Sequence, residues 1–176
     1  YMISLNSNKD SQFFNKIDLN NIGIGGHSQG GLGAMNAVIN HNNGSNYKVI
    51  YTASAPSSGL AAGFLKTPYG DISKLNIPYF QNAGTLKFDA GIDENSGIAP
   101  IWSLKEKFDF VPENVTKIMA RRVNTDHGDM LTHADGYMTA WFMYWLQNDS
   151  EAKKVFFGND AEILFNQNWV DVDKNI

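Results

Sequence analysis

One short segment of the chain places a serine between glycines at the spacing that a catalytic nucleophile requires. Residues 26–30 read Gly-His-Ser-Gln-Gly, which matches the pattern Gly-x-Ser-x-Gly. In this pattern the serine lies on a tight turn between a strand and a helix, where side chains on the flanking glycines would collide. The turn lifts the hydroxyl above the sheet and directs the following N–H, at the positive end of the helix, toward the substrate. The pattern predicts Ser28 as a nucleophile and the Gln29 N–H as an oxyanion donor.

A serine hydroxyl is a poor nucleophile until a base accepts its proton, so a histidine must reach it. The chain has four histidines. His27 lies inside the turn and His41 lies at the far end of the following helix, so neither can act as this base. His127 follows the fourth expected strand, and His133 lies near the start of the next helix. Position favours His127, with His133 as an alternative base in a shifted register or a structural residue.

A carboxylate must hold the imidazole in the correct tautomer, and in this type of site it precedes the histidine along the chain. Asp89 follows the third expected strand and is the favoured acid. Asp93 and Glu94 come a few residues later and are the alternatives. Any of the three could instead be a solvated loop residue, as most carboxylates are.

A metal site is a rival interpretation of the region around the favoured base. His127, Asp129, His133 and Asp135 combine imidazole and carboxylate groups, which are good ligands for zinc or manganese. The two histidines are six residues apart, however, and residues six apart do not share a helix face. The spacing therefore favours loop and helix-start roles for the two aspartates.

Strands that alternate with helices must position these side chains. Because the strands are rich in Ile and Val, they predict a parallel sheet with helices on both faces. In such sheets the chemistry lies beyond the carboxyl ends of the strands. We expect strands at residues 17–25, 49–54, 77–83 and 115–123, and helices at 1–5, 30–40, 101–110, 136–146 and 151–157. The helix at 136–146 is apolar nearly all round, which predicts that it is buried.

Composition limits the classes of function. A chain of 176 residues with 43% hydrophobic residues is sufficient for one domain with a sizeable core. The net charge of −4 gives no basic footprint for nucleic acid. With no cysteine, disulfides and thiolate chemistry are excluded. No apolar run is long enough to cross a membrane.

The residues around Ser28 resemble a known family. The segment 26–31 is similar to that of the cutinase and poly(ethylene terephthalate) hydrolase group, which chlorophyllase-like and dienelactone-hydrolase-like enzymes share. The stretch 139–158 resembles the Trp-bearing helix after the catalytic histidine in that group. The resemblance implies an α/β-hydrolase fold and hydrolysis of small-molecule or lipid-like carboxylic esters through an acyl-enzyme, with Ser28 as nucleophile, His127 as base and no metal or organic cofactor. The family acid usually falls where Leu86 or Lys87 stands, so Asp89 departs from the simplest pattern.

In the α/β-hydrolase fold several strands precede the serine turn. The resemblance therefore implies that residues 1–176 are the C-terminal part of a single hydrolase domain, without the first strands and the second oxyanion donor. We expect weak activity from such a chain, because one missing donor costs about a hundred- to a thousand-fold in rate. We also expect an open sheet edge that pairs with a second copy.

Candidates for the pocket wall are His27, Ser57 and Trp102. Ser54 and Ser57 follow the second strand at the catalytic edge, although ordinary turn chemistry explains them equally well. Most of the tryptophans are expected in the core. A function of another class, a catalytically inactive hydrolase-fold scaffold that binds a ligand or partner, is the alternative to an esterase.

Overall fold

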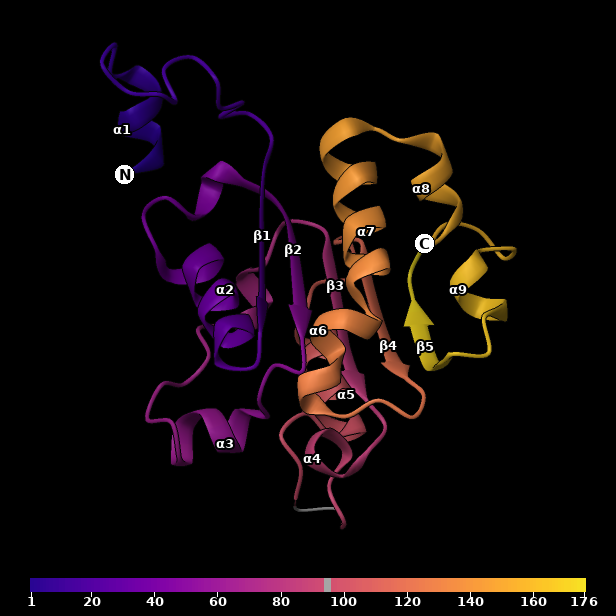
Figure 1. Cartoon of the computed structure of the whole chain (residues 1–176). Helices are drawn as coiled ribbons and strands as arrows, with labels where there is room; N and C mark the ends of the chain where they lie inside the picture. Colours follow the sequence, from indigo (N-terminus) through magenta and orange to yellow (C-terminus); the bar gives the residue numbers. More distant parts are fainter. Residues whose placement is uncertain (94–95) are drawn as a thin grey trace.

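The computed structural model describes residues 1–93 and 96–176. Within these residues the strands form one sheet in the order β1-β2-β3-β4-β5 (Figure 1). β1 to β4 run parallel, and β5 runs antiparallel to β4. The strands span Ile22–His27 (β1), Tyr47–Ala53 (β2), Tyr79–Gly84 (β3), Lys117–Arg122 (β4) and Trp169–Lys174 (β5). The expected α/β class with a mostly parallel sheet is confirmed.

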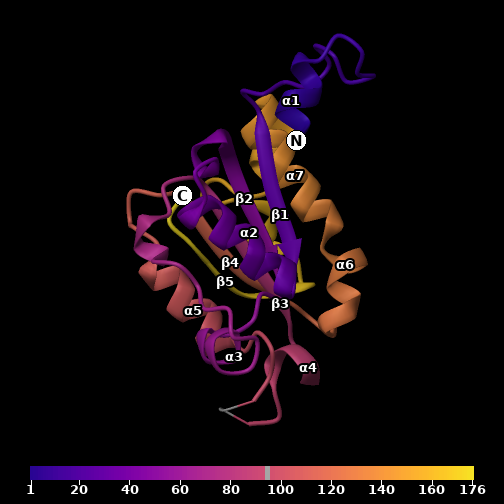
Figure 2. The same cartoon turned by 90° about the vertical axis from the view of Figure 1, so that its left-hand side faces the viewer.

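Helices cover both faces of this sheet. In Figure 2, α2 and α5 lie on one side of the sheet and α7 lies on the other. The α-helices are α1 (Met2–Ser7), α2 (Gln29–Asn40), α3 (Ser58–Gly63), α4 (Lys87–Ala90), α5 (Ile101–Phe110), α6 (Met130–His133), α7 (Asp135–Gln147), α8 (Ser150–Lys154) and α9 (Glu162–Phe165). Short 3-10 turns are η1 (Gly44–Asn46), η2 (Ile72–Lys74) and η3 (His127–Asp129).

Side chains of β2 point alternately to the two faces, and both faces are covered. Val49 and Tyr51 pack into an apolar cluster that includes Trp141 of α7. Ile50 packs instead into a cluster with Met35 of α2. A strand that is buried on both faces needs apolar residues at successive positions, which is why β2 lacks an alternation of polar and apolar residues.

The helix α7 is fully buried at one residue and half-buried at most others. Trp141 is fully buried, and its ring N–H donates a hydrogen bond of 3.1 Å to the carbonyl of Ile50. Tyr137, Phe142 and Trp145 are only partly buried against the same cluster. The expectation of a buried helix is therefore wrong for most of α7, because Trp141 is its one fully buried residue and the large aromatic residues beside it are half-buried.

Two strand expectations need correction. The first strand begins at Ile22 rather than residue 17, because the carboxylate of Asp18 accepts hydrogen bonds from Asn20 N–H and the Asn21 amide and forms a turn there. The strand β5 was not expected, and residues 169–174 read Trp-Val-Asp-Val-Asp-Lys. Its acidic residues and lysine lower strand propensity, although pairing with β4 overrides that preference.

β1 is the first strand in the sheet order, so among the described residues its outer edge has no partner strand. Pairing of this edge with a second copy stays a prediction. Within the same residues, no helix is both long and apolar enough to cross a membrane.

Candidate active site

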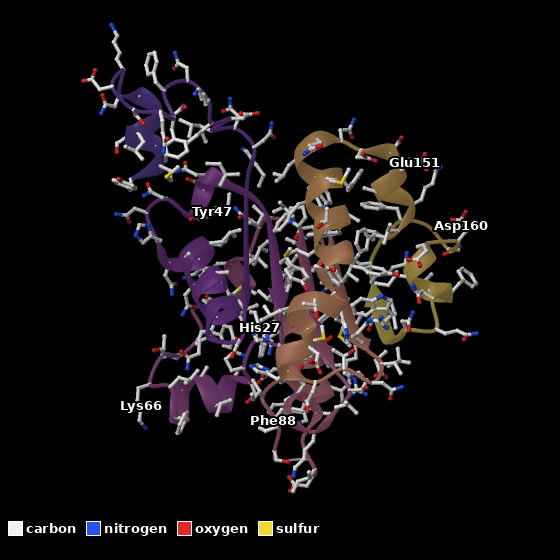
Figure 3. All side chains as sticks on the ribbon, viewed as in Figure 1. His27, Tyr47, Lys66, Phe88, Glu151 and Asp160 are labelled. Atoms are coloured by element: carbon white, nitrogen blue, oxygen red, sulfur yellow. The ribbon has the colours of Figure 1, made fainter. Side chains whose placement is uncertain are left out.

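The candidate residues follow the carboxyl ends of β1, β2, β3 and β4. Because these four strands are parallel, their carboxyl ends meet at the same edge of the sheet. In Figure 3, His27 and Phe88 lie at this edge, whereas Tyr47, at the start of β2, lies toward the opposite end. The arrangement brings the predicted nucleophile, acid and base to one end of the molecule.

The turn that carries Ser28 has a strained backbone. Ser28 has φ 56° and ψ −126°, at the junction of β1 and α2. A Cβ on Gly26 would lie 2.1 Å from the carbonyl oxygen of Gly30, so position 26 must be glycine. A Cβ on Gly30 would meet nothing within 4 Å. The expectation that both flanking glycines prevent collisions is therefore correct for Gly26 and wrong for Gly30.

The N–H of Gln29 lies at the start of α2. Gln29 is the first residue of this helix, so its N–H has no acceptor within the helix. The N-terminus of a helix carries partial positive charge, which favours an anion. This N–H can therefore donate to an oxygen that becomes negative next to Ser28.

Asp89 and His127 form a direct hydrogen bond. His127 Nδ1 lies 2.7 Å from Asp89 Oδ1. The Asp89 side chain is fully buried, whereas the His127 side chain is 20% exposed. This pair has the arrangement in which a carboxylate orients an imidazole and leaves Nε2 as the proton acceptor.

The other carboxylate oxygen of Asp89 is also hydrogen-bonded. Ser54 Oγ donates to Oδ2 at 2.5 Å, and the backbone N–H of Gly84 donates to the same oxygen at 2.7 Å. Ser54 is fully buried and has φ 49°, at the end of β2. A buried carboxylate needs such donors to compensate for lost hydration. The sequence indicates only a pocket or turn role for Ser54, because no local pattern relates it to Asp89, 35 positions away.

Asp93 and His133, two of the alternatives, do not take part in the Asp89–His127 bond. Asp93 is exposed, and Glu94 lies outside the described residues. His133 is exposed on α6, and its Nδ1 lies 3.3 Å from the hydroxyl oxygen of Thr125. Among the described residues, the histidine that is hydrogen-bonded to Asp89 is His127.

His27 connects the serine turn to the loop of His127. His27 Nε2 lies 2.7 Å from the backbone carbonyl oxygen of His127, and the centroids of the two rings are 4.5 Å apart. No hydrogen bond joins the Ser28 hydroxyl to the His127 ring within the described residues. Such bonds are often long before substrate binds. Partial burial lowers the pKa of His27, which favours its neutral form.

Comparison of the sequence with protein-family models and with curated proteins finds no match. The assignment of roles therefore depends on the geometry of the site and on the sequence pattern. Among residues 1–93 and 96–176, no three side chains of His, Asp or Glu come together as a metal site would require.

Two cavities lie beside these residues. A cavity of about 200 Å³ adjoins the serine turn. Its wall is mainly apolar, with Tyr51, Met130, Leu131 and Met138, and it also includes His27 and Asp135. A more open hollow of about 360 Å³ lies over the acid turn and is lined by Leu60, Phe88, Ile92 and Ile98, among others.

The three candidate pocket residues have different positions. His27 lines the smaller cavity. Ser57 is buried, and its hydroxyl accepts a hydrogen bond from Leu60 N–H as the N-cap of α3. Trp102 is 41% exposed on α5 and lines neither of the two cavities. The structure therefore gives Ser57 a capping role, and Trp102 is not part of the wall of either cavity.

Asp126 is a residue near the site that sequence analysis did not identify. Its Oδ1 accepts hydrogen bonds from the backbone N–H groups of Phe88, Asp89 and His127. The bond to His127 joins adjacent residues, whereas an N-cap aspartate normally accepts the N–H of the second or third residue of the turn. The bonds to the acid turn join residues 37 and 38 positions apart, so no local pattern predicts them.

Proposed function

We propose that this protein is a serine hydrolase that cleaves carboxylic esters, and that residues 1–176 form part of an α/β-hydrolase domain. The observation that carries the proposal is the 2.7 Å bond between His127 Nδ1 and buried Asp89, at the sheet edge that also carries Ser28 on its strained turn. Along the chain, the serine (Ser28) comes first, the acid (Asp89) second and the base (His127) third, which is the order in this type of hydrolase. The sequence resemblance to cutinase-like esterases supports the same reaction.

In the first half of the reaction, Ser28 Oγ attacks the ester carbonyl carbon while its proton passes to His127 Nε2. The carbonyl oxygen becomes an oxyanion, to which the Gln29 N–H donates. Asp89 accepts the hydrogen bond from Nδ1 throughout and stabilises the imidazolium. The tetrahedral intermediate expels the alcohol, which takes the proton from Nε2, and the acyl group stays on Ser28.

In the second half, water attacks the acyl carbon and gives a proton to His127 Nε2. The second tetrahedral intermediate releases the carboxylic acid. The proton returns to Ser28 Oγ, and the three side chains are restored. The mainly apolar cavity beside His27 favours an ester with an apolar group of small size.

Labelling with a fluorophosphonate probe tests this proposal, because the probe reacts with an activated serine even when turnover is slow. We expect one adduct in the wild-type chain, located on Ser28 by peptide mass analysis, and none in Ser28→Ala. His127→Ala should label at least a hundred-fold more slowly. His41→Ala, which changes an exposed histidine after α2, is the matched control and should label at the wild-type rate.

Hydrolysis of a short p-nitrophenyl ester provides a second measurement on the same variants. Ser28-dependent release of p-nitrophenol supports an esterase. A folded wild-type chain that neither labels nor hydrolyses the ester would contradict the proposal and favour a catalytically inactive scaffold.

A further inference from the structure

One carboxylate oxygen connects the turn of the acid to the turn of the base. Oδ1 of Asp126 accepts three backbone N–H groups, from Phe88 at 2.8 Å, Asp89 at 3.2 Å and His127 at 2.9 Å. The last two donors belong to the acid and the base of the proposed triad. This oxygen therefore contacts the main chain on both sides of the Asp89–His127 hydrogen bond.

On the acid side, the Asp126 side chain caps α4, because the residue at the N-cap position of that helix cannot. Leu86 occupies the N-cap position of α4, with φ −90° and ψ 176°, and makes no side-chain cap hydrogen bond. Phe88 and Asp89 are the second and third residues of this helix, and their N–H groups are the ones that an N-cap side chain normally accepts. Asp126 accepts both from another loop, so it fixes the first turn of the helix that carries the acid.

On the base side, the same oxygen caps η3, the 3-10 turn that begins with His127. Asp126 is the N-cap of this turn and accepts the His127 N–H. The carbonyl of His127 is bonded to His27 in turn. The main chain of the base is thus held at its N–H by Asp126 and at its carbonyl by the residue next to Ser28.

The loops have other contacts, which lie further from the triad. Leu86 N–H donates to Thr125 O at 3.1 Å, and Asn124 N–H donates to the Thr85 hydroxyl at 2.9 Å. These bonds keep the loops side by side without Asp126. What Asp126 adds is a fixed position for the residues that carry the acid and the base.

We propose that Asp126 is a positioning residue that sets the register between Asp89 and His127. The inference builds on the proposed function, because it assigns a role to the loop that joins the two triad members. Catalysis is sensitive to such a role, since a misplacement of about 1 Å can cost roughly a hundred-fold in rate.

The first test compares Asp126→Ala, Asp126→Asn and Asp129→Ala in the full chain. Alanine removes all three acceptor contacts, whereas asparagine keeps an acceptor oxygen of the same geometry. Asp129→Ala removes the same charge from an exposed side chain on η3 that caps no helix. For Asp126→Ala we expect kcat and the fluorophosphonate labelling rate to fall about a hundred-fold, with KM within about twofold. Asp126→Asn should recover most of the loss, and Asp129→Ala should match the wild type.

A second readout needs no turnover. The proton between His127 Nδ1 and Asp89 should give a low-field NMR signal, identified by its absence in Asp89→Asn. We expect this signal in the wild type, Asp126→Asn and Asp129→Ala, and its loss by solvent exchange in Asp126→Ala. If the wild type shows the NMR signal but does not react with the fluorophosphonate, the proposed function fails. The positioning role is then still tested by comparing the NMR signal of Asp126→Ala with that of the wild type. If Asp126→Ala keeps the signal and the wild-type kcat, the positioning role is overturned.

A double variant addresses the case in which Asp126→Ala does not fold. Leu86→Ser supplies α4 with its own cap, because the backbone at position 86 is already extended and the side chain is exposed. Asp126→Ala/Leu86→Ser should then fold but label more slowly than Leu86→Ser alone, because the His127 N–H still lacks its acceptor. Equal labelling rates in these two variants would overturn the proposal.

Discussion

The nucleophile and the acid–base pair of the proposed site are positioned by different means. Backbone sterics position Ser28: its φ is positive, and a Cβ on Gly26 would lie 2.1 Å from the carbonyl oxygen of Gly30. Side chains position Asp89 and His127. Ser54 donates a hydrogen bond to the Asp89 carboxylate, and Asp126 accepts the backbone N–H groups of Asp89 and His127. The serine turn therefore depends on the absence of a Cβ at Gly26. The acid–base pair depends on hydrogen bonds that the side chains of Ser54 and Asp126 make.

This difference explains how sensitive each side is to substitution. A steric requirement is met or not met, so a methyl group at position 26 forces the whole turn to rearrange. Asp89 has three separate hydrogen-bond partners, so loss of one leaves the other two in place. We therefore expect the largest effects at the serine turn and graded effects at the acid–base side.

The contrast between Gly26→Ala and Gly30→Ala gives the largest expected effect. A Cβ at position 26 would lie 2.1 Å from a backbone oxygen, so the turn must rearrange. We expect Gly26→Ala to abolish measurable labelling of Ser28 and to lower the free energy of unfolding by about 3 kcal/mol or more. Gly30→Ala adds the same methyl group where nothing lies within 4 Å, and it should keep the wild-type labelling rate. Equal effects of the two variants, measured by labelling and urea unfolding, would contradict the steric account.

Replacement of Ser54 tests the acid–base side. Ser54→Ala removes the 2.5 Å donor to Asp89 but leaves the Gly84 N–H and His127 in place. Hydrogen bonds to charged groups contribute about 1.5–3 kcal/mol, so we expect a loss of stability in that range and about a tenfold fall in kcat. Ser58→Ala removes a similar hydroxyl–carboxylate bond, to Glu106 at 2.8 Å, away from the triad. It should leave kcat unchanged, and a Ser54→Ala variant with the same outcome would show that the network does not support the acid.

The same contrast explains which parts of the molecule the sequence predicts. The serine turn is encoded within five consecutive residues, and the buried parallel strands are indicated by short segments of mainly apolar residues between turns. The roles of Ser54 and Asp126 could not be predicted in this way, because their partners lie 35 to 38 positions away. The strand β5 was missed for a related reason, since its pairing with β4 outweighs the low strand propensity of Asp171 and Asp173.

His27 lies between the two sides, and its protonation couples stability to pH. Partial burial lowers the pKa of His27 below 6.5, although its bond to the His127 carbonyl acts in the opposite direction. The folded chain therefore binds fewer protons at this residue than the unfolded chain does as pH falls through 6.5. The free energy of unfolding should decrease over that interval relative to its value at pH 7.5.

His27→Gln tests this coupling, because glutamine keeps an N–H donor for the His127 carbonyl but does not titrate. The stability advantage of the wild type over His27→Gln should shrink between pH 7.5 and pH 5.5, as measured by urea unfolding followed by tryptophan fluorescence. A difference that stays constant over this range would mean that His27 has the same proton affinity in the folded and unfolded chains.

The smallest effect is expected at His133. This prediction tests whether the base of the proposed site is His127 or His133. His133 is exposed, its imidazole Nδ1 lies 3.3 Å from the Thr125 hydroxyl, and its backbone carbonyl accepts the bond from Arg122 Nε. His133→Asn keeps that carbonyl, so we expect kcat and labelling within twofold of the wild type and a change in stability below about 0.5 kcal/mol. His127→Asn, the matched variant, should lose labelling. If the two variants behaved in the opposite way, the base would belong to α6, and the Asp89–His127 hydrogen bond would be a structural contact rather than half of a catalytic pair.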